Sequence, residues 1–197
     1  MQLHIANATI HLTMPTGIPG QVLDFATIRG TAPADAPVPA LTPPAHGEYW
    51  PGQGGLFICT LPALLGVPAR HLICSLAEAV DLTFGPGIDV PGAVSQLDGL
   101  ANTAALIATG KDHPAAQWAA GYTADGHADF YLPSRLDMVM AHICAPQLFN
   151  KEGYYWTSTQ HSRNDAFVQG FENGYSYWVN VGYGRRVRAF RWVHLTA

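Results

Sequence analysis

Residues 154–193 read YYWTSTQHSRNDAFVQGFENGYSYWVNVGYGRRVRAFRWV, and this stretch decides the fold that the sequence predicts. Strand-like runs rich in aromatic and β-branched residues span 154–159, 166–171, 175–181 and 186–195. Between the second and third runs, Asn173-Gly174 suits the positive φ angles of a tight hairpin. We therefore predict a four-stranded antiparallel set at the carboxyl end of the chain.

Upstream of this stretch, the pattern changes to helices preceded by two short strands. The strands are expected at 56–61 and 71–75, and the helices at 97–109, 114–120 and 133–144. Strands, then helices, then strands again is the order of an α+β domain. The sequence thus predicts an α+β fold rather than an alternating α/β fold.

The helix expected at 133–144 has the clearest signals. Ser134 is placed to cap its first turn, and Asp137 three residues later completes a capping-box pair. The apolar positions at i, i+3, i+4 and i+7 form one stripe, at Leu136, Val139, Met140 and Ile143. We expect this stripe to pack in the core.

The chain divides at a proline-rich segment. Residues 1–31 contain two strand-like runs and are too few to bury a core alone, so we predict a short N-terminal β extension. Residues 32–46 include all five prolines of the run at 31–45, and this proline content favours an extended linker. Residues 47–197 form the main domain, with a recognition segment at 154–193.

The composition of the 197-residue chain indicates which classes of partner to expect. Only 12% of the residues are charged, so we expect some surface to be covered in a homo-oligomer or a larger particle; a soluble monomer rich in small residues is the alternative. No apolar run is long enough to span a membrane. Residues 1–150 carry eleven acids and four bases (−7), and residues 151–197 carry three acids and six bases (+3). This difference in charge is too weak to predict nucleic-acid binding.

The first five residues bear on where the protein is assembled. Met1-Gln2-Leu3-His4-Ile5 lacks the positive and apolar regions of a signal peptide, so we expect assembly in the cytoplasm and release with a virion or particle.

The chain has three cysteines, Cys59, Cys74 and Cys144. They match no zinc or redox spacing and are expected to be small buried hydrophobic residues.

Aromatic residues concentrate near the carboxyl end. Eleven of the chain's twenty-one aromatics lie between Tyr154 and Trp192, interleaved with serine, glycine, asparagine and glutamine. This mixture is typical of antibody paratopes, where rings give contact area and small polar residues adapt their hydrogen bonds. Strand preference alone explains some of these rings, but it accounts poorly for the adjacent Tyr177 and Trp178, since neighbouring strand residues face opposite ways.

Three motifs resemble a known family. Tyr131-Leu-Pro-Ser-Arg135 resembles the "RLPT-x-x-E" motif of the DUF1566 family, and Tyr155-Trp-Thr-Ser-Thr159 its "YWTST" motif. Arg186-Val-Arg-Ala-Phe-Arg191 resembles its closing "RVRAVR". That family is related to the C-type-lectin fold of formylglycine-generating enzymes, and is similar to the variable proteins of diversity-generating retroelements, including phage receptor-binding proteins. The resemblance covers residues 47–197 and implies a C-type-lectin-like fold.

The resemblance also implies which residues form the framework and which face a ligand. The implied framework is Trp156, Thr157, Ser158, Ala166, Phe167, Phe171, Gly174, Val187, Arg188 and Arg191. The implied ligand-binding positions are Gln160, His161, Arg163, Asp165, Val168, Gly170, Tyr175, Tyr177, Trp178, Asn180 and Tyr183. Whether this segment is hypervariable is a hypothesis, which a template repeat differing only at adenines would support.

Enzymatic relatives on this fold need residues that the sequence lacks. A formylglycine-generating activity needs a late cysteine pair, and the only late cysteine is Cys144, inside an expected helix. An iron-dependent sulfoxide synthase needs three clustered histidines, and no H-x-x-x-H spacing occurs. The calcium-binding Glu-Pro-Asn and Trp-Asn-Asp tripeptides are absent, and 125–129 is more simply a turn. We predict no catalytic residues, no cofactor and no metal.

Two functional hypotheses remain. The first is a non-enzymatic receptor-binding protein, associated with a phage, prophage or retroelement, that binds a protein or a glycan on a cell surface. The second is a structural phage component whose aromatic face is a subunit interface. They differ in whether Tyr175, Tyr177, Trp178 and Tyr183 are accessible in the isolated oligomer.

The arginines at 185, 186, 188 and 191 have two interpretations. They hold the last strand against the acid-rich part of the chain through ion pairs, or they flank the binding face and attract an anion. Strand alternation places Arg188 and Arg191 on different faces, which favours the first.

Overall fold

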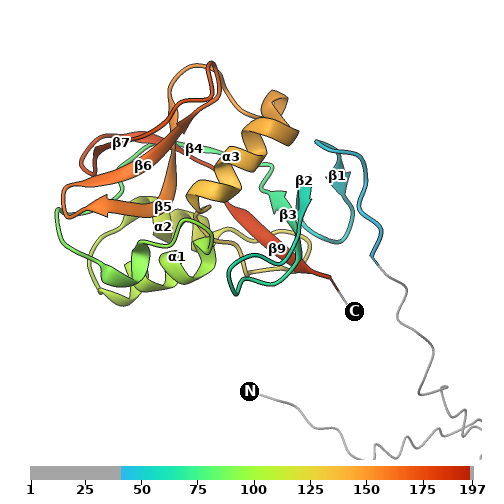
Figure 1. The fold of residues 1–197 in the computed structure, drawn as a ribbon, viewed down its shortest axis with the longest axis horizontal. Helices are drawn as coiled ribbons and strands as arrows, with labels where there is room; N and C mark the ends of the chain where they lie inside the picture. Colours follow the sequence, from blue (N-terminus) through green and yellow to red (C-terminus); the bar gives the residue numbers. More distant parts are fainter. Residues whose placement is uncertain (1–40, 196–197) are drawn as a thin grey trace, which may run out of the picture. The chain divides into compact units, whose positions relative to one another are not determined.

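The computed structural model describes residues 41–195 and has an α+β fold of three α-helices and two sheets (Figure 1). The helices are α1 (Gly99–Ala108), α2 (Pro114–Gly121) and α3 (Arg135–Cys144), with 3₁₀ turns at Pro91–Ala93 and Pro146–Leu148. The strands are β1 (Tyr49–Trp50), β2 (Gly55–Leu61), β3 (Arg70–Cys74), β4 (Ala79–Leu82), β5 (Tyr154–Ser162), β6 (Asp165–Gly170), β7 (Ser176–Asn180), β8 (Arg185–Val187) and β9 (Phe190–His194). The predictions for residues 1–31, and for 32–40 of the linker, lie outside the described residues.

One sheet has the order β1-β2-β3-β9 and the other the order β4-β8-β5-β6-β7. β5, β6 and β7 form the antiparallel meander that the sequence predicts, and Gly174 takes φ +76° in the turn before β7. The fourth predicted strand, 186–195, is wrong as a single element. Its first part is β8, which runs parallel to β5, and its second part is β9, which pairs with β3 in the other sheet.

The break in that strand has a clear physical reason. Val187 packs in the core beneath β5 and β6, whereas Phe190 packs in the core between α3 and β3. Between them, the backbone of Ala189 makes two hydrogen bonds with Ser75. The Ser75 N–H donates to the Ala189 carbonyl at 2.7 Å, and the Ser75 hydroxyl accepts from the Ala189 N–H at 3.1 Å. The segment is thus fixed at a crossing between two sheets, and no local sequence signal marks that crossing.

α3 lies between the two sheets, beside β5 and β6 on one side and β2 on the other (Figure 1). Its predicted capping box is confirmed, because the Ser134 hydroxyl accepts from the Asp137 N–H and the Asp137 carboxylate accepts from the Ser134 N–H. The predicted core stripe is only partly confirmed. Leu136 and Met140 are half-buried against the core, but the fully buried apolar residues of the helix are Met138 and Ala141, and Ile143 is 65% exposed. Because α3 packs against sheets on two sides, the buried positions follow those contacts rather than the most hydrophobic stripe.

Candidate functional site

The exposed aromatic residues that the sequence predicts are present at the carboxyl end. Tyr175, Trp178 and Tyr183 expose 64%, 51% and 55% of their surface. Tyr177 is half-buried, because its ring packs edge-on against Tyr154 at a centroid distance of 5.1 Å and against the core below. Three of the four rings are therefore free to contact a ligand, and the fourth is partly a framework residue.

Three of the predicted ligand-binding positions are buried and do not face a ligand. Gln160 is 5% exposed, and its side-chain amide accepts from the Val90 N–H at 2.8 Å and donates to the Ile88 carbonyl at 2.7 Å. Val168 faces the core opposite Tyr177, and Gly170 is covered by the Tyr154 ring. The prediction that these positions face a ligand is wrong, because bulges in β5 bring Gln160 inward and alternation along β6 does the same for Val168.

Trp178, His161 and Phe167 form one continuous aromatic surface on the outer face of β5, β6 and β7. The His161 and Trp178 rings stack at 4.2 Å with an interplanar angle of 22°. Phe167 lies opposite Trp178 across the β6–β7 pair, and its ring meets the other two edge-on at 5.3 and 6.0 Å. Phe167 is buried, so it supports the two exposed rings from below.

Arg135, at the start of α3, adds a cation to this surface. Its guanidinium carbon lies 4.3 Å from the centroid of the Phe167 ring, a cation–π arrangement. The Arg135 Nε donates to the Ser176 hydroxyl at 2.9 Å, so α3 and β7 are tied together beside Trp178. We call the group of Arg135, His161, Phe167 and Trp178 the Trp178 patch. Arg135 was not among the predicted site residues, because no local pattern shows that a helix start lies beside a distant strand.

The other polar positions predicted for the site bond mainly to the protein itself. The Asp165 carboxylate accepts from the Ser162 hydroxyl at 2.9 Å, and the Asn180 side chain accepts from the Gly182 N–H at 3.0 Å. The Arg163 guanidinium donates to the Gly87 carbonyl at 3.1 Å. Arg163 and Asn180 are exposed, so they form the polar margin of the β5–β6 turn.

Tyr177 and Tyr183 belong to a different surface from Trp178. Because neighbouring strand residues face opposite ways, Tyr177 lies on the reverse of the sheet from Trp178, beside Tyr154. Tyr183 lies in the turn after β7, and the Arg185 guanidinium carbon is 5.1 Å from its ring centroid. Burial first, and then the neighbouring Tyr154 hydroxyl, raise the pKa of Tyr177. The predicted set of ligand-binding residues is thus split between two faces.

An open groove adjoins this tyrosine surface. It has a volume of about 460 Å³ and lies where β4 and β8 meet the start of β5. Its lining residues are Val80, Asp81, Glu152, Gly153, Tyr154, Gly184, Arg185 and Arg186. Sequence reasoning singled out none of Asp81, Glu152 or Tyr154 for a site, since Asp81 lies far in the chain from the other two.

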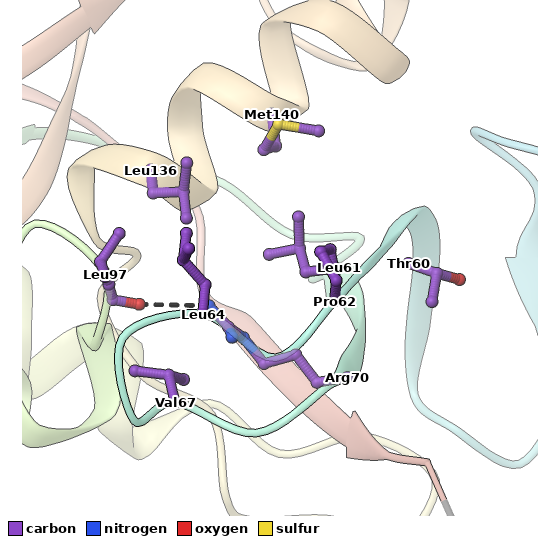
Figure 2. Close-up of a pocket in the computed structure, with 9 residues that line it drawn as sticks. All are labelled: Thr60, Leu61, Pro62, Leu64, Val67, Arg70, Leu97, Leu136 and Met140. Carbon is purple, nitrogen blue, oxygen red and sulfur yellow. Dashed lines mark hydrogen bonds between the residues drawn. The ribbon is translucent and has the colours of Figure 1, made fainter.

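A second, apolar hollow of about 230 Å³ lies between α3 and the loop after β2 (Figure 2). Leu136 and Met140 of the α3 stripe line one wall of it, facing Leu61 and Leu64. Arg70 is buried at its base, where it donates to the carbonyls of Pro68 and Leu97 at 3.2 Å, lies 3.7 Å from Asp137 and covers the Trp192 ring. The guanidinium is therefore committed to the protein, and the hollow presents an aliphatic surface.

The arginines of the carboxyl end have mostly structural partners. Arg186 pairs with Glu78 at 2.6 Å, and Arg191 pairs with Asp129. The 125–129 segment is a turn, as expected, and the Asp125 carboxylate accepts from the Tyr49 hydroxyl and from the N–H groups of Gly52 and Gly54. The hydrogen bond from Tyr49 is the main cause that lowers the pKa of Asp125.

In the part of the chain that the structure describes, no three histidine, cysteine, aspartate or glutamate side chains gather closely enough to hold a metal ion. Among residues 41–195, no helix is both long and apolar enough to cross a membrane. Cys59 and Cys74 are buried and free, as the sequence suggests, and Cys144 is half-buried and free.

Comparison with known proteins gives little to place beside this geometry. No protein-family model matches the sequence, and no curated protein matches it. A fimbrial protein from Bacteroides ovatus is similar in structure, with a TM-score of 0.47 and 14% sequence identity. The similarity covers 61% of this chain and 35% of the fimbrial protein, and it is too slight to support an argument about fold or function.

Proposed function

We propose that this protein is a non-enzymatic recognition module with a C-type-lectin-like fold, and that the Trp178 patch is the centre of its ligand-binding surface. The ligand is a protein or a glycan on a cell surface, and the setting is a phage, prophage or retroelement-associated particle. The observation that carries the proposal is the pair of exposed, stacked rings of Trp178 and His161 on a buried framework.

The patch has the make-up of a binding hot spot. Tryptophan and arginine are the residues most enriched among those that dominate binding energy, and here they are neighbours. Trp178 is fixed from two sides by His161 and Phe167, so little conformational entropy is lost when a ligand covers it. Arg163 and Asn180 provide the polar margin that such a surface needs.

The framework under the patch supports the lectin-like part of the proposal. Trp156, Thr157 and Ser158 of the YWTST motif are fully buried, and their polar atoms bond to carbonyls of Leu82, Phe167 and Pro133. Every hydrogen-bonding side chain of that motif is thus used to hold the sheet. A rigid framework with exposed rings at its edge is the arrangement that a display scaffold requires.

The alternative is that the Trp178 patch is an interface between subunits of a particle. The two functions predict different solvent access to Trp178 in the isolated protein. Trp178 is the most exposed of the described tryptophans, so collisional quenching reports on it well. Ligand recognition would be supported if wild type shows a quenchable tryptophan component at every protein concentration and Trp178→Phe lacks that component. Protection that develops as the protein oligomerises would favour the interface.

The direct experiment is a binding screen against bacterial cells and a glycan array. Wild type is compared with Trp178→Ala and with Ile143→Ala, a matched truncation of an exposed apolar side chain near the other end of α3. We expect Trp178→Ala to weaken each captured ligand at least about thirtyfold, which corresponds to a 2 kcal/mol hot spot. Ile143→Ala should bind as wild type does. Capture that survives Trp178→Ala unchanged would refute the assignment of the patch.

A further inference from the structure

The groove beside Tyr154 lies on the opposite side of the β5–β7 sheet from the Trp178 patch. Tyr154 lines it and contacts Tyr177, whose neighbour Trp178 faces the other way. Two glycines, Gly153 and Gly184, form part of its wall, and the Asp81 carboxylate occupies the space beside Gly184. At about 460 Å³ it is within the size range of small-molecule sites.

An unusual backbone conformation places one carboxylate in the groove. Asp81 has φ +58°, in the left-handed region that few residues other than glycine adopt, and it lies at the irregularity in the pairing of β4 with β8. Bulges of this kind redirect side chains and are frequent beside binding sites. The Asp81 carboxylate approaches Gly184 so closely that a Cβ there would lie 1.8 Å from its Oδ1, so position 184 has no space for a side chain.

Donors and acceptors stand together around the groove. Asp81 and Glu152 supply carboxylate oxygens, and Arg185 and Arg186 supply guanidinium N–H groups. The Arg185 Nη1 donates to the Gly184 carbonyl at 2.8 Å, which fixes this guanidinium at the wall of the groove.

The groove has no excess of positive charge. Asp81 and Glu152 offset the charges of Arg185 and Arg186, and the Arg186 guanidinium is also paired with Glu78 at 2.6 Å and donates to the Glu152 carbonyl at 3.1 Å. A site for phosphate or sulfate needs excess positive charge, which this groove lacks. A neutral ligand with several hydroxyl groups both donates to carboxylates and accepts from guanidiniums, so it matches the lining.

The rings beside the groove complete this chemistry. Tyr154 lines it directly, and Tyr183 is 55% exposed with its ring fixed against Arg185. Tyrosine offers an apolar face and a polar hydroxyl, which suits a sugar ring with its apolar C–H face and polar edge. From these contacts we infer that the groove of Asp81, Glu152, Tyr154 and Arg185, with Tyr183 at its margin, binds a neutral saccharide. This site does not depend on the Trp178 patch.

The test uses the methyl glycosides of glucose, galactose and mannose as probes, with binding followed by saturation-transfer NMR on the full chain. We expect at least one to bind with a dissociation constant on the order of a millimolar, unchanged between low and high salt, because the ligand is neutral. Asp81→Asn, which keeps a residue that tolerates positive φ, should weaken binding about tenfold, since it removes a charged acceptor. Tyr183→Ala should weaken it by a similar factor.

Trp178→Ala is the matched control and should leave glycoside binding unchanged, even if it abolishes the capture expected of the Trp178 patch. Thermal unfolding of each variant checks that Asp81→Asn is folded; if it is not, Tyr183→Ala alone decides, since that ring is exposed. The inference is overturned if no glycoside binds, or if Trp178→Ala weakens binding as much as Asp81→Asn does. Tighter, salt-dependent binding of glucose 6-phosphate than of the methyl glycosides would also overturn it, because the site would then be one for anions.

Discussion

Replacing Gln160 by alanine tests whether this residue belongs to the framework or to a ligand-binding surface. Its side-chain amide is the partner of the Val90 N–H and the Ile88 carbonyl, both in the loop that precedes α1. Gln160→Ala leaves the Val90 N–H buried without a partner, at a cost of about 1–3 kcal/mol. Loss of the second hydrogen bond adds about 1 kcal/mol. We therefore expect the free energy of unfolding to fall by about 2–4 kcal/mol.

The measurement is urea unfolding followed by circular dichroism, with Gln117→Ala as the matched control. Gln117 is exposed on α2, so the same chemical change there should alter the free energy of unfolding by less than about 0.5 kcal/mol. For a domain of this size, the loss in Gln160→Ala corresponds to about 5–15 °C in Tm. A Gln160→Ala variant as stable as the Gln117→Ala control would show that the amide is not needed by the loop, and would return Gln160 to the candidate ligand-binding residues.

Two further outcomes follow from buried titratable groups. Burial raises the pKa of Asp137 from 3.8 to about 6, so the folded protein favours the protonated carboxyl. The stability that this protonated form contributes is fully present below pH 3.8 and is lost as the pH rises through 6, a loss on the order of 3 kcal/mol. Urea titrations from pH 4 to 7 should show this decline in wild type but not in Asp137→Asn; equal slopes in both would contradict it. Burial also raises the pKa of Cys59 to about 12 and of Cys74 to about 11, and the thiolate is the reactive form. In a Cys144→Ser background at pH 8, a disulfide reagent should therefore label no thiol in the native protein and two in guanidinium chloride, and rapid labelling of the native protein would refute the burial.

The sequence was sufficient to predict the elements whose signals are local. β2, β3, the three helices and the β5–β7 meander lie within a few residues of their expected positions, and the Ser134–Asp137 capping box is present. The short strands β1 and β4 were not predicted. These features depend on contacts between residues near in sequence. The division of 186–195 between two sheets depends instead on Ser75 and β3, more than a hundred residues away, so no local pattern could reveal it.

The prediction of the α3 stripe was only partly correct, and the prediction that Gln160 faces a ligand was wrong, for a related reason. Hydrophobic periodicity predicts burial correctly when a helix packs on one side, but α3 has a neighbour on two sides and buries Asp137 with Met138 and Ala141. Leu136 and Met140 are left to line the apolar hollow of Figure 2. Gln160 looks like a surface residue by type, and only the loop that its amide holds explains why it is inside.

Alternation along β7 also limits what kind of binding surface the carboxyl end can form. Trp178 and Tyr177 are adjacent in the chain, yet one stacks on His161 at the outer face and the other contacts Tyr154 on the reverse. A single rigid ligand cannot cover both sides of a sheet, so these rings cannot act together as one paratope. Because the two surfaces have no side chain in common, substitutions on them should have additive effects on binding and stability. The two proposed binding surfaces are therefore separate, and each can be tested with the other as its control.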